Sequence, residues 1–117
     1  MKVSLPFNVP SHQAESRKSA RGGWKTEKLS SYQELIGWEA VKASKGQPII
    51  EGNFKAIIKF GLKGKRHGDL DNMEKSTFDA LEGIVFRNDK SLCHKESFYT
   101  YCDPPYVEIW IDETILV

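Results

Sequence analysis

Residues 53–62 of this 117-residue chain, NFKAIIKFGL, alternate between apolar and polar side chains. A period of two is typical of a β-strand with one buried face, because successive side chains point to opposite sides of a sheet. The stretch therefore predicts a strand over the core, with Lys55 and Lys59 on its solvated side. Its core side would carry Phe54, Ala56, Ile58, Phe60 and Leu62.

A helix is predicted on each side of this strand along the chain. The first would begin near Ser31, which forms a capping-box pattern with Glu34, and would end at Gly46. The second would cover residues 72–83 and end at Gly83. Their apolar residues recur at helical spacing: Leu35, Trp38 and Val41 beside Ile36, Ala40 and Ala43 in the first, and Met73, Thr77, Ala80, Leu81 and Ile84 in the second.

Three further short strands complete the predicted sheet. They are residues 3–7, VSLPF, residues 97–102, SFYTYC, and residues 106–111, YVEIWI. The sequence DPP between the last two is a turn signal, which predicts that they pair with each other antiparallel. The order β, α, β, α, β, β indicates an α+β fold in a single domain over residues 1–117, with two helices packed on a mixed sheet of about four strands.

Composition favours a folded domain without a membrane partner. Hydrophobic residues make up 39% of the chain, but the longest apolar run is too short to cross a bilayer. The first residues turn polar before a signal peptide could form, so the protein is expected in the cytoplasm. Cys93 and Cys102 have neither CxxC spacing nor a four-ligand set and are predicted to be reduced core side chains. A zinc site from Cys93, His94 and Glu96 is disfavoured, because neighbouring strand residues point to opposite faces.

Charge is divided unevenly along the chain. Residues 1–68 have thirteen Lys and Arg against five Asp and Glu, a balance of +8, and residues 69–117 have four against eleven, a balance of −7. This division suggests a basic surface for a polyanion and an acidic region with another task. Residues 11–30 are predicted to be a long loop rich in basic side chains, which would suit contacts with phosphates and bases. The alternative is a loop that is only solvated. Its candidate DNA-binding residues are Arg17, Lys18, Arg21 and Lys25.

Two aspartates one residue apart, Asp69 and Asp71, follow the predicted strand and its basic extension. In extended backbone their carboxylates would share one face about 6 Å apart, where like charges repel by about 3 kcal/mol at an effective dielectric of about 20. A divalent cation would offset this repulsion, and Mg²⁺ prefers such oxygen ligands. The alternative is structural: Asp71 with Glu74 also fits a helix N-cap, and Asp69 fits a turn after Gly68.

Two more residues are candidates for the same site. Lys75 lies one turn beyond Asp71 on the predicted helix, so its ammonium group would lie near whatever the aspartates bind. An ordinary ion pair with Asp71 or Asp79 is the alternative. Asp89, in the polar break before the next strand, could return a third carboxylate to the end of the sheet, or could be a turn residue.

Taken together, GDLDNMEKSTFDALEG and the later ND resemble the RusA family of Holliday junction resolvases. The shared pattern is D-x-D-N, a lysine four residues after the second aspartate, a D-A-L helix end and a later acidic pair. The matching positions are Asp69, Asp71, Asn72, Lys75, Asp79, Ala80, Leu81 and Asp89. The chain departs from the pattern in two places: the later pair is Asn88-Asp89, one acid short, and the Pro- and Asn-rich stretch after the first strand is only partly matched by FNVPSHQ.

The resemblance implies a homodimeric endonuclease of phage or prophage type that nicks four-way DNA junctions symmetrically in recombination and repair. It implies Mg²⁺ as the cofactor, with Mn²⁺ as a substitute, and no nucleotide cofactor. Asp69, Asp71 and Asp89 would be the metal-binding acids, Lys75 the catalytic lysine, and Asp79 a structural residue. In a twofold dimer the sites would lie on one basic face and be bordered by Lys63, Lys65 and Arg66.

Two other functions fit parts of the sequence. One is a catalytically inactive protein that binds branched or duplex DNA with the same basic face and has lost its third acid. The other is a D-x-D nucleotide-sugar transferase, although that chemistry needs a nucleotide-binding domain larger than this chain. Cleavage or binding of a synthetic junction distinguishes all three.

Overall fold

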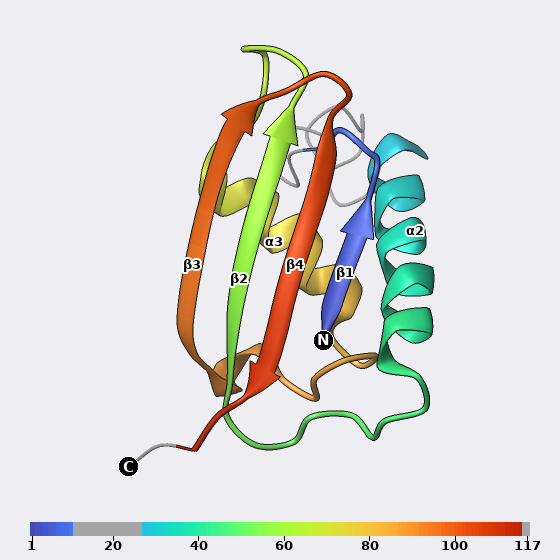
Figure 1. Ribbon diagram of the computed structural model, residues 1–117, viewed down its shortest axis with the longest axis vertical. Coiled ribbons are helices and arrows are strands. Elements are labelled where there is room, and N and C mark those ends of the chain that lie inside the picture. Colours follow the sequence, from blue (N-terminus) through green and yellow to red (C-terminus); the bar gives the residue numbers. More distant parts are fainter. Residues whose placement is uncertain (11–26, 116–117) are drawn as a thin grey trace, which may run out of the picture.

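Four strands form one mixed sheet in the order β1-β4-β2-β3 (Figure 1). The computed structural model describes residues 1–10 and 27–115. β2 pairs with β3 in parallel and with β4 antiparallel, and β4 pairs antiparallel with β1. The predicted α+β fold with a mixed four-stranded sheet and two helices is therefore confirmed. The strands are β1 (Lys2–Leu5), β2 (Phe54–Leu62), β3 (Leu92–Tyr101) and β4 (Tyr106–Glu113).

The central strand β2 has the predicted orientation. All five predicted core side chains, from Phe54 to Leu62, are fully buried, and Lys55 is exposed on the other face. Burial of a large apolar side chain contributes about 1.5–3 kcal/mol, so this strand supplies a large share of the core's stabilisation. On the open face the ring of Tyr106 lies against Gly61, and an added Cβ at Gly61 would come within 2.4 Å of that ring. The glycine therefore allows the close approach.

Two helices, α2 (Glu27–Ser44) and α3 (Leu70–Leu81), complete the fold. They contact each other, and α2 also packs against β1 (Figure 1). The predicted capping box at Ser31 is wrong as a helix start, because Ser31 lies inside α2. Among the described residues, neither helix combines the length and apolarity that crossing a membrane requires.

The side of α2 that faces the core differs from the prediction. Its buried residues are Leu29, Tyr32, Gln33, Ile36, Gly37 and Ala40, whereas Leu35, Trp38 and Val41 are exposed. The helix carries two apolar stripes, and tertiary contacts select between them. Tyr32 reaches α3, where its hydroxyl and that of Thr77 form a buried hydrogen bond of 2.7 Å. Burial raises the pKa of Tyr32, and the Thr77 hydrogen bond opposes part of that rise.

The predicted hairpin between the last two strands is also wrong. β3 and β4 do not pair with each other, because β2 lies between them and pairs with both. The DPP segment therefore connects strands that are not neighbours. A turn signal specifies a change of direction, whereas pairing depends on which strands bury the most apolar surface.

The C-terminal end of α3 follows the prediction closely. The helix ends at Leu81, Glu82 is the C-cap, and Gly83 follows with φ of 86°. Glycine adopts this left-handed conformation without the strain that a side chain would cause, which explains its position after the helix. The backbone N–H of Gly83 then donates to the carbonyl of Phe86, 2.8 Å away, and begins the return toward β3.

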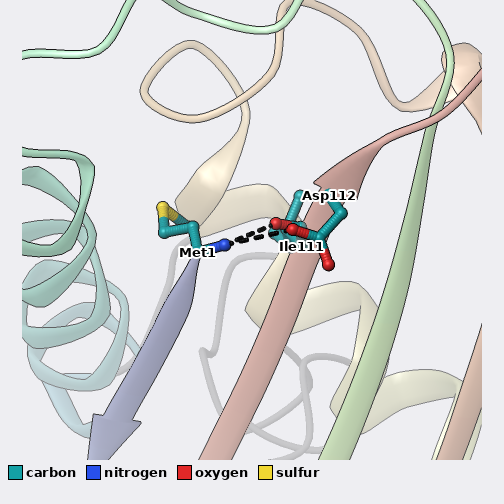
Figure 2. A network of polar contacts seen from close by, with 3 residues as sticks. All are labelled: Met1, Ile111 and Asp112. Atoms are coloured by element: carbon teal, nitrogen blue, oxygen red, sulfur yellow. Dashed lines mark hydrogen bonds and ion pairs between the residues drawn. The ribbon is translucent and has the colours of Figure 1, made fainter.

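The start of β1 is joined to the end of β4 (Figure 2). The amino group of Met1 donates to the carbonyl oxygen of Ile111 at 2.9 Å and to the Asp112 carboxylate at 3.3 Å. The N–H of Ile111 donates back to the carbonyl of Met1 at 3.0 Å. These contacts continue the antiparallel ladder by one residue and hold the edge strand β1 in register.

The prediction that both cysteines are core side chains is wrong for Cys93. Both thiols are free, but Cys93 is exposed and Cys102 is half-buried. Cys93 lies at the register shift between Phe54 and Lys55, where its thiol contacts the carbonyl of Phe54 at 3.4 Å. A bulged residue at an edge strand is turned away from regular pairing, which accounts for its exposure.

Candidate active site

The acidic pair lies where β2 passes into α3. The connecting residues 63–69, called the basic loop here, contain Lys63, Lys65 and Arg66, all exposed, and no acid before Asp69. The loop is held at its start, where the N–H of Lys63 donates to the Asn8 side chain at 3.0 Å. This contact joins the segment after β1 to the start of the site.

Asp69 and Asp71 were expected to follow one another in extended backbone, but they lie at the start of a helix. α3 begins at Leu70, so Asp69 is the N-cap residue and Asp71 lies in the first helical turn. The structural alternative is changed as well, because Asp71 is not the cap and the side chain of Asp69 makes no capping hydrogen bond. Both carboxylates are exposed. The positive end of the helix dipole stabilises negative charge at these two positions, which offsets part of their mutual repulsion.

Lys75 lies one turn after Asp71 and is exposed. Its ammonium nitrogen is 3.8 Å from Oδ2 of Asp79, four residues further along the helix. Surface pairs of this kind contribute little, about 0.3–0.5 kcal/mol, so the lysine can leave Asp79 for a phosphate at small cost. The sequence allowed an ion pair of Lys75 with either Asp71 or Asp79, and the structure has the pair with Asp79.

On its inward side, α3 is fixed to the edge strand by a contact that the sequence did not reveal. Glu74 is almost fully buried, and its Oε2 lies 2.6 Å from Nζ of Lys95 on β3. Its neighbour along the helix, Ser76, donates to the carbonyl of Pro10 at 3.1 Å. These contacts hold the helix that carries Asp71 and Lys75 against both β3 and the segment after β1.

The third predicted acid lies elsewhere in the chain. Asp89 begins the short 3₁₀ helix η1 (Asp89–Ser91), which precedes β3. Because β2 and β3 run parallel, the start of β3 and the end of β2 are at opposite ends of the sheet (Figure 1). The residues that the structure describes contain no group of three His, Cys, Asp or Glu able to hold a metal. Within one chain, therefore, Asp89 is not brought to Asp69 and Asp71.

The other predicted DNA contacts fall into two groups. Lys63, Lys65 and Arg66 are exposed in the basic loop, next to the acidic pair. The remaining four, Arg17, Lys18, Arg21 and Lys25, lie outside the described residues.

The structure adds a group of aromatic side chains that the sequence did not single out. His67 of the basic loop packs against Tyr99 and Tyr101 of β3, with ring centroids 4.9 and 5.8 Å apart. In the sequence these two tyrosines are simply typical strand residues. The signal that could have identified them is the parallel register, which places Tyr101 beside Leu62, the last residue before the basic loop.

The sequence of the chain matches the model of one protein family. Residues 6–112 match the family model described as endodeoxyribonuclease RusA. A search of curated proteins gave no match to the chain. Because the match covers nearly the whole chain, the protein belongs to the RusA endodeoxyribonuclease family. Membership makes it an enzyme of the nuclease class and implies Holliday junction resolvase activity on branched DNA.

Proposed function

We propose that this protein is a Mg²⁺-dependent endonuclease that resolves four-way DNA junctions by paired, symmetric nicks during recombination and repair in the cytoplasm. One observation carries the proposal: two exposed carboxylates at the start of α3, of which the N-cap residue Asp69 makes no side-chain capping hydrogen bond, lie between a basic loop and an exposed lysine. The test is cleavage of a synthetic four-way junction with and without Mg²⁺, next to a linear duplex of the same sequence. Junction binding without nicking in Mg²⁺ would favour the inactive DNA-binding alternative instead.

The donor set suits a hard divalent cation. Mg²⁺ usually keeps several waters and takes one or two carboxylates together with substrate phosphate oxygens. Asp69 and Asp71 would supply these carboxylates, and Mn²⁺ would substitute for Mg²⁺. When bound, the cation supplies an activated water and stabilises charge on the phosphate in the transition state.

The remaining roles follow from position. Lys75 would place its ammonium group near the scissile phosphate, where it stabilises the developing negative charge. Phosphates that flank the cleaved bond would be bound by the basic loop and by the basic residues between Pro10 and Glu27. Pro10, the last described residue before them, accepts a hydrogen bond from Ser76 on α3. The proposed phosphate-binding residues are Lys63, Lys65, Arg66, Arg17, Lys18, Arg21 and Lys25.

Asp89 would reach the site from a second subunit. In the proposed dimer, a twofold axis that reverses the strand direction would bring η1 of one subunit to the end of the sheet where the other subunit carries its basic loop. The third carboxylate at Asp69 and Asp71 would then be Asp89 of the partner subunit, and each dimer would have two composite sites. A four-way junction needs two cuts, which a dimer of this kind provides. The position of Asp89 at the far end of the sheet supports this arrangement.

The surface that would join the subunits is an apolar patch on α2 and the turn that follows α3. Its members, called the α2 patch here, are Leu35, Trp38, Val41 and Ile84, with exposed fractions of 41, 61, 50 and 37%. A shallow groove along the patch is also lined by Gln33, whose buried side-chain oxygen has no hydrogen-bond partner within the described part of the chain. A second copy would cover these apolar groups.

The open face of the sheet is less suited to that task. Its aromatic rings already have cations over them: Lys2 lies 5.2 Å from the ring centre of Trp110, and Lys59 lies 5.8 Å from that of Phe98. Removing these ammonium groups from water would oppose association. The α2 patch carries no such cation contact among the described residues.

Replacing Lys75 with alanine is expected to lower the turnover number by about 100-fold, the lower end of what one positioned catalytic group supplies. Junction affinity should fall much less, because the side chain is one of many phosphate contacts. Single-turnover nicking and a binding titration separate the two effects. Lys55→Ala, an exposed lysine on the open sheet face, is the matched control and should change neither. Equal losses of turnover and affinity would make Lys75 a simple phosphate contact.

A further inference from the structure

Beside the acidic pair lies the group His67, Tyr99 and Tyr101, called the aromatic trio here. The three rings contact one another, since the two tyrosine centroids are also 5.9 Å apart, edge to face. His67 precedes Asp69 by two residues and so connects the rings directly to the acidic pair. The trio and the acidic pair therefore meet at the junction of β3, the basic loop and α3.

Hydrogen bonds fix the orientation of the imidazole. Nδ1 of His67 is 2.8 Å from the carbonyl oxygen of Gly68, and Nε2 is 3.1 Å from the hydroxyl of Tyr101. A carbonyl oxygen only accepts, so Nδ1 must carry the proton and donate. In the neutral ring Nε2 then accepts from the Tyr101 hydroxyl. Both contacts are made by the ring nitrogens, in the plane of the imidazole, and so do not involve the faces of the ring.

The rings remain open to solvent. Tyr99 is 43% exposed and Tyr101 49%, whereas Phe60, beside Tyr99 on β2, is fully buried. The side chains of Tyr99 and Tyr101 point to the side of the sheet where the helices lie, because these tyrosines pair in register with the buried Phe60 and Leu62 of β2. Core packing therefore accounts for Phe60 but not for the two tyrosines, which keep large apolar faces in water.

The surroundings of the trio select a polyanionic ligand. The same loop carries Lys63, Lys65 and Arg66, all exposed. Aromatic rings set among cations are the combination that binds single-stranded nucleic acid, in which the cations contact the backbone and the rings stack on bases. A base inside a duplex is already paired and stacked on its neighbours, so its faces are not available for stacking on the aromatic trio.

We propose that the aromatic trio stacks on a nucleobase that has left the base stack at the branch point of a DNA junction. Stacking there would position the neighbouring backbone over Asp69 and Asp71, and would favour branched DNA over linear duplex. The inference rests on the proposed function, because it assumes that branched DNA reaches the acidic pair.

The first measurement compares junction and duplex affinity in the presence of a chelator, so that no cleavage is needed. Tyr99→Leu should lower junction affinity by about 5- to 150-fold, the range for loss of one base–aromatic stack, and should leave linear-duplex affinity unchanged. Tyr99→Phe keeps the ring and should bind as the wild type does. Phe98→Leu is the matched control, because Phe98 is similarly exposed at 46% on the opposite face of the same strand.

The second measurement removes the base instead of the ring. A set of junctions, each with one abasic nucleotide within two positions of the branch point, is bound to the wild type and to Tyr99→Leu. At the stacked position the wild type should lose about as much affinity as the tyrosine substitution costs, and the variant should lose nothing further. Because each protein serves as its own reference, a partial loss of folding in the variant does not affect the comparison.

Two results would overturn the inference. One is unchanged junction affinity in Tyr99→Leu, and the other is an equal loss from every abasic substitution in both proteins. A wild-type protein that nicks junctions while Tyr99→Leu behaves normally would remove the stacking proposal alone. A wild-type protein that neither binds nor nicks junctions would instead remove the proposed function.

Discussion

Asp71→Asn is expected to abolish junction nicking, with a loss near the upper end of the 100- to 1,000-fold scale, roughly, of a lost electrostatic contact to the transition state. The substitution removes a proposed metal ligand while preserving the size of the side chain. It also removes a negative charge near the DNA phosphates, so junction affinity should stay the same or increase. Parallel nicking and binding assays on the same junction measure both effects.

The control for this substitution is Glu108→Gln. Glu108 lies in the middle of β4 on the open face of the sheet, where it pairs with Lys2, so the change removes one negative charge on the face opposite the helices. It should leave nicking unchanged. An Asp71→Asn protein that cuts at the normal rate would show that Asp71 is not a metal ligand.

Mixing two inactive variants is expected to restore activity. Asp71→Asn and Asp89→Asn should each be inactive alone. In a mixed dimer with composite sites, one site carries both substitutions and the other carries neither. Random exchange makes half of the dimers mixed, so the mixture should regain about a quarter of the wild-type sites. Nicking by the mixture, compared with each variant alone, measures this recovery.

The mixing experiment also distinguishes the source of the third acid. If Asp89 served its own chain, both sites of a mixed dimer would be damaged and the mixture would stay inactive.

The proposed interface is tested separately with Trp38→Asp. This variant should be a monomer by light scattering and should not nick junctions, because Trp38 is the most exposed member of the α2 patch. A dimeric Trp38→Asp protein would place the interface on another face.

Local sequence patterns predicted which residues form helices and strands better than they predicted which of these elements pair or pack together. The alternation from Phe54 to Leu62 fixed both the strand and its buried face, because a one-residue shift would expose all five apolar side chains. Gly83 marked the end of α3 through its backbone conformation. Each of these signals is contained in a few neighbouring residues.

Choices that depend on distant contacts were not predictable in the same way. α2 has two apolar stripes, and the buried one is the stripe of Tyr32, whose hydroxyl forms a hydrogen bond with that of Thr77 on α3. The insertion of β2 between β3 and β4 depends on the whole sheet and not on the turn between them. Glu74 shows the same difficulty, since its partner Lys95 is on another element.

The candidate site was predicted by residue type and only partly by geometry. The D-x-D spacing identified Asp69 and Asp71, but the expected extended backbone is a helix start. The position of Asp89 depends on β3 being parallel to β2, which no local pattern indicates. The aromatic trio forms for the same reason, because the parallel register places Tyr99 and Tyr101 beside the basic loop.

The most direct test is metal-dependent cleavage of a synthetic four-way junction by the wild-type protein. The central claim is that Asp69 and Asp71 hold a divalent cation at which a DNA phosphodiester is hydrolysed. With Mg²⁺ or Mn²⁺ the protein should produce paired nicks in opposing strands, with a chelator it should produce none, and a linear duplex should stay intact. Tight junction binding with no nicking at any concentration of either metal would contradict the account.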